Sequence, residues 1–396
     1  MRGDFDDQLP LFHVFEVEDR IPVDHPLRDI KRRADRILGS LNARFEAAYS
    51  VTGRPSVPPE RLLKALLLMA LYSVRSERQL CEQIDLNLLF RWFLDMQPSE
   101  DAFDASTFSK NRQRLETHGL TQAFFDAVVA EALAKHLCSE HFSVDGTLIE
   151  SFASAKSFQP QQQQDERPQD EPPKKERSAK EPQSDGNGFK PSNPDVDFHG
   201  QQRTNATHAS QTDPEARLYR KGRGKEAKLS HLGHVLNENR HGLILRVAVT
   251  EANGEAERQA ATDMLDDLKA KHQRVPKTMG ADKGYDDSEF FQELEDRQIE
   301  PHIPLVREPA KLKTVRHKKR HPGIRARQRM KRRMKTEGYS LSQKCRKKIE
   351  ECFGWLKTVA GMDRSRVVGR WKLRQLLEVS AAAFNLVRMR RLAPVA

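Results

Sequence analysis

Three acidic side chains stand in settings that suit the binding of metal ions. Asp145 and Asp282 each follow a short apolar run and precede a glycine, and Glu350 lies on a predicted late helix. Carboxylate oxygens hold Mg²⁺ together with water and phosphate. Two such ions stabilise the entering and leaving oxygens of an in-line phosphoryl transfer. The three acids therefore predict metal-dependent chemistry at a phosphodiester.

Each acid also fits a simpler role when it is taken alone. An Asp-Gly pair is common in turns for local backbone reasons, which favours a turn at Asp145. A similar arrangement recurs at Asp282, with Lys283 between the acid and Gly284, and this repetition within one α/β segment is what favours a shared site at strand ends. Glu350 equally fits an ordinary surface ion pair.

The predicted helix around Glu350 carries two cations on the same face as this acid. Arg346 lies four residues before Glu350 and Lys357 seven residues after it, so the three side chains share one face. Glu350 stands at the edge of the apolar stripe, whereas Glu351 turns further towards solvent; the stripe consists of Ile349, Phe353 and Leu356. This pattern predicts a metal ligand between two phosphate-binding cations.

The charge of the chain points to a polyanionic partner. Its formal net charge is +11, and residues 306–348 contain eighteen Lys or Arg but only two acids. Such a density favours phosphate binding, with release of counterions, although a solvated basic linker has the same composition. No apolar run reaches the roughly 20 residues of a membrane span, and four cysteines without paired spacing favour a reducing cytoplasm. We expect DNA as the partner and no membrane.

Residues 1–138 read as a helical region. Apolar residues from 27 to 45 follow one helix face, Pro58 and Pro59 open the next helix, and Ser76 caps another. A later helix from about residue 104 carries three cations on its polar side, which we predict to bind DNA: Lys110, Arg112 and Arg114. The region fits a helix-turn-helix-like DNA reader, and it also fits a dimerisation bundle.

Residues 139–396 read as an α/β region with an insertion. Residues from about 158 to 200 are rich in Gln, Pro, Lys and Glu, which predicts a disordered segment. Strands are expected at residues 142–145, 229–236, 243–250, 278–281 and 299–305, with helices after the third and fourth and a final helix. By analogy, this order fits a ribonuclease H-like mixed sheet flanked by helices.

The chain resembles the DDE transposases of bacterial insertion sequences, in the large group around insertion-sequence families four and five. The resemblance runs along most of the chain. It rests on these segments: TGRP (52–55), RSERQL (75–80), NLLFRW (87–92), STFSKNR (106–112), VDGT (144–147), THASQTDP (207–214), ADKGY (281–285) and EECFGWLK (350–357).

The resemblance implies that Asp145, Asp282 and Glu350 form the catalytic and metal-binding triad, with two Mg²⁺ ions for which Mn²⁺ substitutes. It implies cleavage at the ends of a mobile element and transfer of the freed 3′-hydroxyl into target DNA. The partners would be terminal inverted repeats and target DNA, bound by at least a homodimer in the bacterial cytoplasm, in association with the nucleoid. The family's Tyr-Arg-Glu-Lys signature matches Arg346, Glu350 and Lys357, but Gln343 occupies the tyrosine position.

Two rival functions fit the same composition. One is a catalytically inactive protein that only occupies the ends of its element. The other is a ribonuclease H-fold nuclease, which cuts without joining. The presence of all three acids and both flanking cations argues against the first, and an assay for joined DNA product separates the second.

Overall fold

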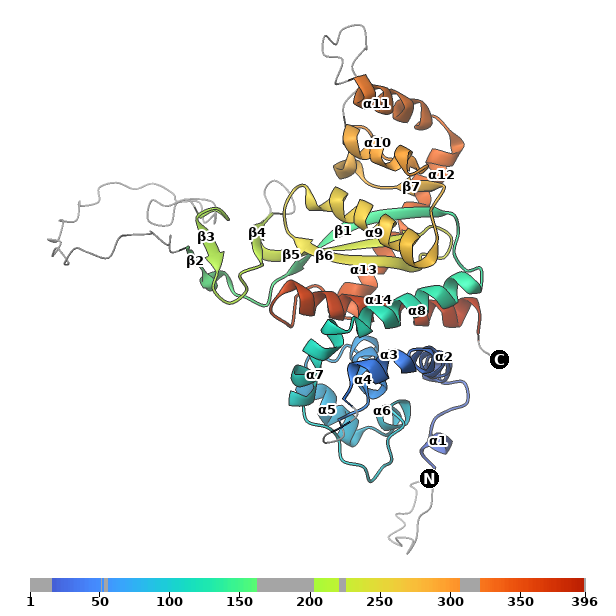
Figure 1. Ribbon diagram of the computed structural model, residues 1–396, viewed down its shortest axis with the longest axis vertical. Helices are drawn as coiled ribbons and strands as arrows, with labels where there is room; N and C mark the ends of the chain where they lie inside the picture. The colour runs from blue at the N-terminus through green and yellow to red at the C-terminus, as the bar shows by residue number, and fades with distance from the viewer. Residues whose placement is uncertain are drawn as a thin grey trace, which may run out of the picture.

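The computed structural model describes residues 16–50, 52, 56–161, 203–220, 226–306 and 321–394. Helices of the N-terminal part lie at one end, a curled mixed sheet lies in the middle, and helices α10 to α12 lie at the other end (Figure 1). Among the described helices, none is both long enough and apolar enough to cross a bilayer.

The N-terminal part is helical, as the sequence predicts. Proline opens the fourth helix at Pro59, and Ser76 caps the fifth by accepting the Gln79 N–H at 3.1 Å. The apolar face from residue 27 to 45 was predicted as one helix, and this is wrong, because Leu41 leaves the helical conformation with ψ near 3°. The helices are α1 Val17–Arg20, α2 Pro26–Ser40, α3 Asn42–Ala48, α4 Pro59–Leu71, α5 Glu77–Leu86, α6 Leu88–Phe93, α7 Ser106–Thr117 and α8 Leu120–Ala134.

The central sheet has the predicted strand order, which is that of a ribonuclease H-like fold. Strands β6, β5 and β1 pair antiparallel, and β7 and β8 continue the sheet beyond β1 in parallel. The short strand β4 pairs with the first residues of β5. The strands are β1 His141–Glu150, β4 Arg217–Tyr219, β5 Lys228–Glu238, β6 Ile244–Glu251, β7 Thr278–Gly280 and β8 Glu300–His302, and helices α9 Ala256–His272 and α10 Ser288–Asp296 separate the last three.

The predicted insertion begins later than the sequence indicates. Its first residues form strand β2 Phe158–Pro160, which follows the 3₁₀ turn η1 Ala155–Ser157 and pairs with β3 His208–Ser210 in a separate two-stranded sheet. Phe158 is buried against Ala216 and Leu229. This apolar contact fixes the chain at the start of the polar segment. Residues 162–202 lie outside the described part of the chain.

Four helices complete the fold after β8. They are α11 His321–Arg333, α12 Glu337–Arg346, α13 Lys348–Thr358 and α14 Arg370–Leu392. Helix α14 lies between the sheet and the N-terminal helices, where it packs on β6 on one side and on α8, α4 and α2 on the other (Figure 1). The hydrophobic core consequently runs without a break from the N-terminal helices to the sheet. The division into domains 1–138 and 139–396 remains a prediction.

A buried asparagine joins α14 to the sheet. The side chain of Asn385 is fully buried, accepts the Ile244 N–H at 2.8 Å and donates to the Ile244 carbonyl at 2.7 Å. It thus satisfies both backbone groups of the first residue of β6, as a neighbouring strand would do. Buried polar groups of this kind are costly to leave without partners.

Replacing Asn385 with Ala will lower the free energy of unfolding by about 2–4 kcal/mol, because two buried backbone groups lose their partners. Urea denaturation monitored by circular dichroism measures this change. The exposed Asn42 bonds only to Glu46 on its own helix, so the matched control Asn42→Ala will stay within about 0.5 kcal/mol of the wild type. An equal effect of the two variants would contradict the role of Asn385.

A buried acid on α14 makes the stability depend on pH. Burial raises the pKa of Glu378 to about 7, although Thr121 donates a hydrogen bond to its carboxylate at 2.6 Å and Arg374 lies nearby. Because the folded state binds the proton more tightly than the unfolded state, stability decreases as the pH rises from 4.5 through about 7.

Replacing Glu378 with Gln will therefore stabilise the protein at pH 8 by about 2–3 kcal/mol and will have little effect at pH 4.5. Glu337→Gln, at an exposed position on α12, serves as the control and will leave the pH profile unchanged. Unfolding free energies measured at both pH values test this; a Glu378→Gln variant that is equally shifted at pH 4.5 and pH 8 contradicts it.

Candidate active site

Asp145 lies in the middle of a strand and not at its end, so the predicted strand-end position is wrong. Strand β1 continues to Glu150 because it pairs with β5 along its whole length. On its other side, β1 pairs with β7 only from His141 to Ser143. Asp145 therefore lies two residues beyond the point where the parallel ladder stops, and its side chain is 24% exposed at that edge.

Asp282 lies at the same edge, two residues after β7. It begins the short 3₁₀ helix η2 Lys283–Tyr285, and its side chain accepts the Gly284 N–H at 2.8 Å. A Cβ atom at Gly284 would lie 2.9 Å from the Asp282 Oδ1 atom, so the glycine leaves room for this carboxylate. The glycine that follows Asp282 thus shapes the turn that holds the acid.

Glu350 approaches the edge from helix α13. Ile349 and Leu356 are buried beneath this helix and fix its orientation, while Glu350 is exposed. The neighbouring Glu351 pairs instead with Arg388 of α14 at 3.1 Å. Both glutamates are exposed, and Glu351 has an ion-pair partner on α14. The assignment of Glu350 as the ligand therefore remains a prediction.

The charges of the two other acids act on Asp145. Burial raises the pKa of Asp145 to about 6, and the charges of Asp282 and Glu350 raise it further. The Gly146 N–H and the Arg346 guanidinium act in the opposite direction. Acids that are far apart in the sequence therefore interact at one edge of the sheet.

The three carboxylates do not form a compact set of metal ligands in this structure. No group of three or more His, Cys, Asp or Glu side chains in the described ranges is arranged to hold a metal ion. Arg346 contacts Asp145, with 3.4 Å between the Nη1 and Oδ2 atoms, and occupies one of its oxygens. Like charges repel when no cation lies between them. The donor set, composed of carboxylate oxygens, nevertheless suits hard divalent cations.

A fourth acid, which the sequence analysis missed, lies beside Asp145. Glu257 stands in the first turn of α9, and its Oε1 atom lies 2.8 Å from the position of a Cβ at Gly146. Burial raises its pKa, and Asp282 and Asp145 raise it further. The only sequence signal was an acid at the start of the helix that follows β6, and nothing there revealed that this helix turn packs on β1.

Tyr285 is a buried tyrosine near the acids of the candidate site. Its ring is fully buried, and its hydroxyl has no hydrogen-bond partner among the described residues. Burial raises its pKa well above the ordinary value, and the charges of Glu257, Asp145 and Asp282 act in the same direction. The hydroxyl therefore stays protonated and can donate a hydrogen bond.

The predicted DNA-binding cations of α7 have different environments. Lys110 is exposed, as the sequence predicts. Arg112 was placed on the polar side of the helix, and this is wrong: it is 7% exposed and pairs with Glu77. Arg114 lies over the ring of Tyr49, 4.5 Å from its centroid. Helical periodicity alone did not reveal that Glu77 of α5 pairs with Arg112.

Part of the positive charge of residues 306–348 is neutralised by acids within the protein. Arg327 of α11 makes two hydrogen bonds to Asp286, at 2.7 and 3.0 Å, and Arg329 and Arg333 both pair with Glu295 of α10. These arginines hold α11 against α10. Residues 307–320, which carry much of the remaining charge, lie outside the described part of the chain.

The substituted signature position has a structural partner. Gln343 of α12 donates to the carbonyl of His302 at the end of β8. The nearby Tyr339 is 9% exposed and packs edge-on against the ring of His302, with 5.7 Å between the centroids. Both side chains therefore hold α12 against the sheet. Lys357, the last member of the signature, lines a cavity at the other end of α13.

Comparison with solved structures gives only remote likenesses. The Mos1 transposase paired-end complex with the left transposon end is 13% identical and has a TM-score of 0.21, with 86% of this chain and 81% of that chain covered. A pre-cleavage Mos1 transpososome is 14% identical with the same coverage and TM-score. At TM-scores this low, the similarity does not establish a shared structure. No curated protein sequence matches this chain significantly.

Comparison with protein families is informative. The model of a transposase domain (DUF772) matches residues 15–114, and the model of a transposase DDE domain matches residues 198–386. The second match contains Asp282 and Glu350, while Asp145 lies between the two matched segments. Together the matches span most of the chain, from the N-terminal helices to α14. This protein belongs to the DDE transposases.

Proposed function

We propose that this transposase cleaves DNA at the ends of its element and joins the freed 3′-hydroxyl to target DNA, using two Mg²⁺ ions held by Asp145, Asp282 and Glu350. The proposal is supported by the electrostatics of Asp145, on which the charges of Asp282 and Glu350 both act. The three acids come from β1, from the turn after β7 and from α13. Each lies on a rigid element, as metal-assisted phosphoryl transfer requires.

The residues of the site have distinct tasks in this proposal. When bound, divalent cations neutralise the scissile phosphate and make a water or a 3′-hydroxyl a better nucleophile. Asp145 and Asp282 hold the cations from the sheet, and Glu350 holds them from α13. Glu257 accepts hydrogen bonds from the attacking water or completes the ligand set, because its carboxylate lies against Gly146.

Arg346 acts on the charge balance of the site. It lies against Asp145, with 3.4 Å between the nearest atoms, and its positive charge partly offsets the repulsion between the acids. Its guanidinium can bind a phosphate in two-pronged geometry. We propose that Arg346 exchanges the carboxylate for the DNA backbone when cations and DNA bind.

The assembly is also part of the proposal. Transposition joins two ends of one element, and a protein with one acid cluster cuts one strand at a time. We therefore propose at least a dimer on DNA, with terminal inverted repeats and target DNA as its partners. The N-terminal helices remain candidates for end recognition, with the exposed Lys110 as the available cation on α7.

Replacing Asp145 with Asn will abolish cleavage of element-end DNA in Mg²⁺, by at least roughly a thousandfold, while DNA binding persists. Cleavage and joining are measured on labelled duplexes that contain the ends of the element. Asp263→Asn is the matched control, because Asp263 bonds only to Gln259 on the outer side of α9. Retained cutting by Asp145→Asn contradicts the proposal, and cutting by the wild type without any joined product favours a nuclease.

Cation binding will depend on pH around the raised pKa of Asp145. Below pH 6 this carboxyl is protonated, and a cation must displace the proton, so the apparent affinity for Mn²⁺ or Mg²⁺ will fall by up to about tenfold per pH unit. The rise in melting temperature caused by Mn²⁺ will accordingly be large at pH 7.5 and small at pH 5.

The variant Asp145→Asn will lose most of this rise at both pH values, whereas Asp263→Asn will behave as the wild type does. A rise that is equal at pH 5 and pH 7.5 in the wild type contradicts the assignment of Asp145 as a ligand. This measurement follows thermal unfolding and does not depend on any cleavage activity.

A further inference from the structure

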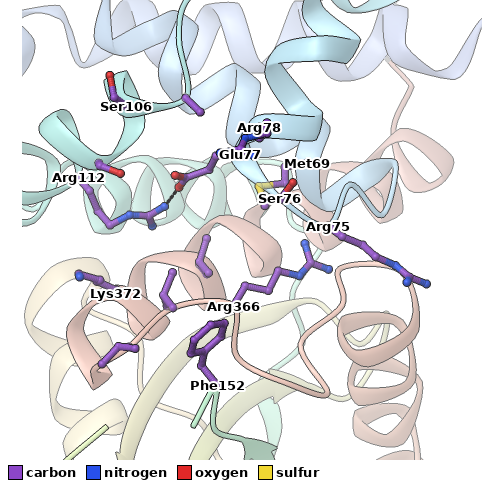
Figure 2. A pocket seen from close by; sticks show the side chains of 15 residues that line it. Met69, Arg75, Ser76, Glu77, Arg78, Ser106, Arg112, Phe152, Arg366 and Lys372 are labelled. Atoms are coloured by element: carbon purple, nitrogen blue, oxygen red, sulfur yellow. Dashed lines mark hydrogen bonds and ion pairs between the residues drawn. The ribbon is translucent and has the colours of Figure 1, made fainter. Parts of the chain in front are cut away.

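A groove with basic walls runs between the N-terminal helices and the C-terminal part of the chain. Two adjoining cavities, of about 730 and 1080 Å³, share Arg75, Ser76, Phe152 and Arg366 in their linings. Figure 2 shows that Arg75 and Arg78 come from the α4–α5 side, while Arg366 and Lys372 come from the opposite side. We call this feature the basic groove.

The cations of the basic groove differ from the arginines inside the protein. Within the described residues, no carboxylate lies within ion-pair distance of Arg75, Arg78, Arg364 or Lys372, and Arg75, Arg78 and Arg364 are exposed. Two acids also line the groove, and one of them, Glu77, is already paired with Arg112. The other, Asp363, is exposed. Four cations of the groove therefore lack a carboxylate partner among the described residues.

Two side chains join the walls of the groove, because Ser73 donates to the carbonyl of Val359 at 2.7 Å and Arg366 also bridges the walls. Arg366 donates to the carbonyl of Val74 on the opposite wall and to that of Ala360 on its own wall, the latter at 3.5 Å. Gly361 has a φ of 66°, and a Cβ there would lie 1.7 Å from the guanidinium of Arg366. Only a glycine allows both this turn and the bridge. A groove of fixed width suits a ligand of regular width.

The basic groove includes a residue of the helix that carries Glu350. Lys357 lines the groove and lies seven residues after Glu350 on α13, which corresponds to two turns, or about 10 Å, along the same helix face. Phe152 follows the end of β1, the strand that carries Asp145. A polymer whose phosphate lies at the three acids can therefore continue along the groove.

We propose that the basic groove binds the phosphodiester backbone of the DNA that leads away from the scissile bond. This inference rests on the proposed function and identifies the surface that holds the substrate. Arg75, Arg78, Arg364 and Lys372 neutralise successive phosphates and release counterions. Phe152, whose side chain is 52% exposed, provides an aromatic surface for sugars or for unpaired bases.

DNA binding by the full chain tests this proposal without any need for cleavage. Fluorescence anisotropy in EDTA is measured with a 30-base-pair duplex and with a 30-nucleotide single strand, each over a series of NaCl concentrations. The double variant Arg75→Ser/Arg364→Ser removes one cation from each wall. At 0.1 M NaCl it will bind roughly tenfold or more weakly, and the slope of log K against log[salt] will decrease by about 2.

The matched control is Arg240→Ser/Arg391→Ser, which also removes two exposed arginines. Arg391 lies near the other end of α14, roughly 30 Å along the helix from Lys372. This control will keep the affinity and the salt slope of the wild type. Equal losses in both double variants, or an unchanged slope in the groove variant, would overturn the proposal. All four side chains lie at the surface, and melting temperatures verify that both variants fold.

Phe152→Ala decides which form of DNA occupies the basic groove. A loss of affinity confined to the single strand assigns the groove to an unpaired strand, and unchanged binding of both DNAs assigns it to the backbone of a duplex. The assay also separates this proposal from the proposed function. A wild-type protein that binds through the groove but does not cut DNA in Mg²⁺ contradicts the function and leaves the groove assignment intact.

Discussion

Repulsion among carboxylates at one edge of the sheet is the constraint on which the rest of this structure depends. Burial and two neighbouring acids raise the pKa of Asp145 to about 6. Isolated charges at such a place would move apart or stay protonated. They remain together because β1, β7 and α13 are each fixed by a buried core, with Phe142, Met279 and Ile349 fully covered. The raised pKa of Asp145 is the electrostatic consequence of this arrangement.

Helix α14 gives the site its rigid support. It fills the space between the sheet and the N-terminal helices, and Asn385 joins it to the first residue of β6. Arg33 extends this connection, because it is fully buried among Asp29, Glu131 and the carbonyl of Ala393 just beyond α14. A movement of the N-terminal helices would consequently be transmitted to the catalytic sheet through packed side chains.

The arginines of this protein fall into two groups with different roles. Arg112, Arg327 and Arg333 pair with acids of neighbouring helices and hold the fold together. Arg75 and Arg364 face the basic groove without carboxylate partners in the described part of the chain. Net charge therefore indicates a polyanionic partner, but it does not identify which cations contact that partner.

Much of the fold and the principal acids could be predicted from residue patterns. Apolar periodicity located most helices and strands, and the strand order indicated the mixed sheet. Asp145 and Asp282 were singled out because each follows an apolar run and has a glycine close behind it in the sequence. A tight turn beside a carboxylate favours glycine, so the sequence shows this feature directly. Glu350 was distinguished from Glu351 by its place relative to the apolar stripe, since helix geometry alone sets that angle.

Other features depended on contacts between segments that are distant in the chain. Glu257 lies near Asp145 because α9 packs on β1. Arg112 is buried and pairs with Glu77 of α5. Asp145 lies in mid-strand because β1 stays paired with β5 beyond the point where its pairing with β7 stops. The basic groove likewise forms only where residues 75–78 meet residues 364–372. By itself, the sequence determined most local elements and their order along the chain, because these follow from short-range backbone and burial preferences, and it predicted the three acids. Only the tertiary structure decided which charges are paired and which face the substrate, because ion pairing depends on neighbours that packing supplies.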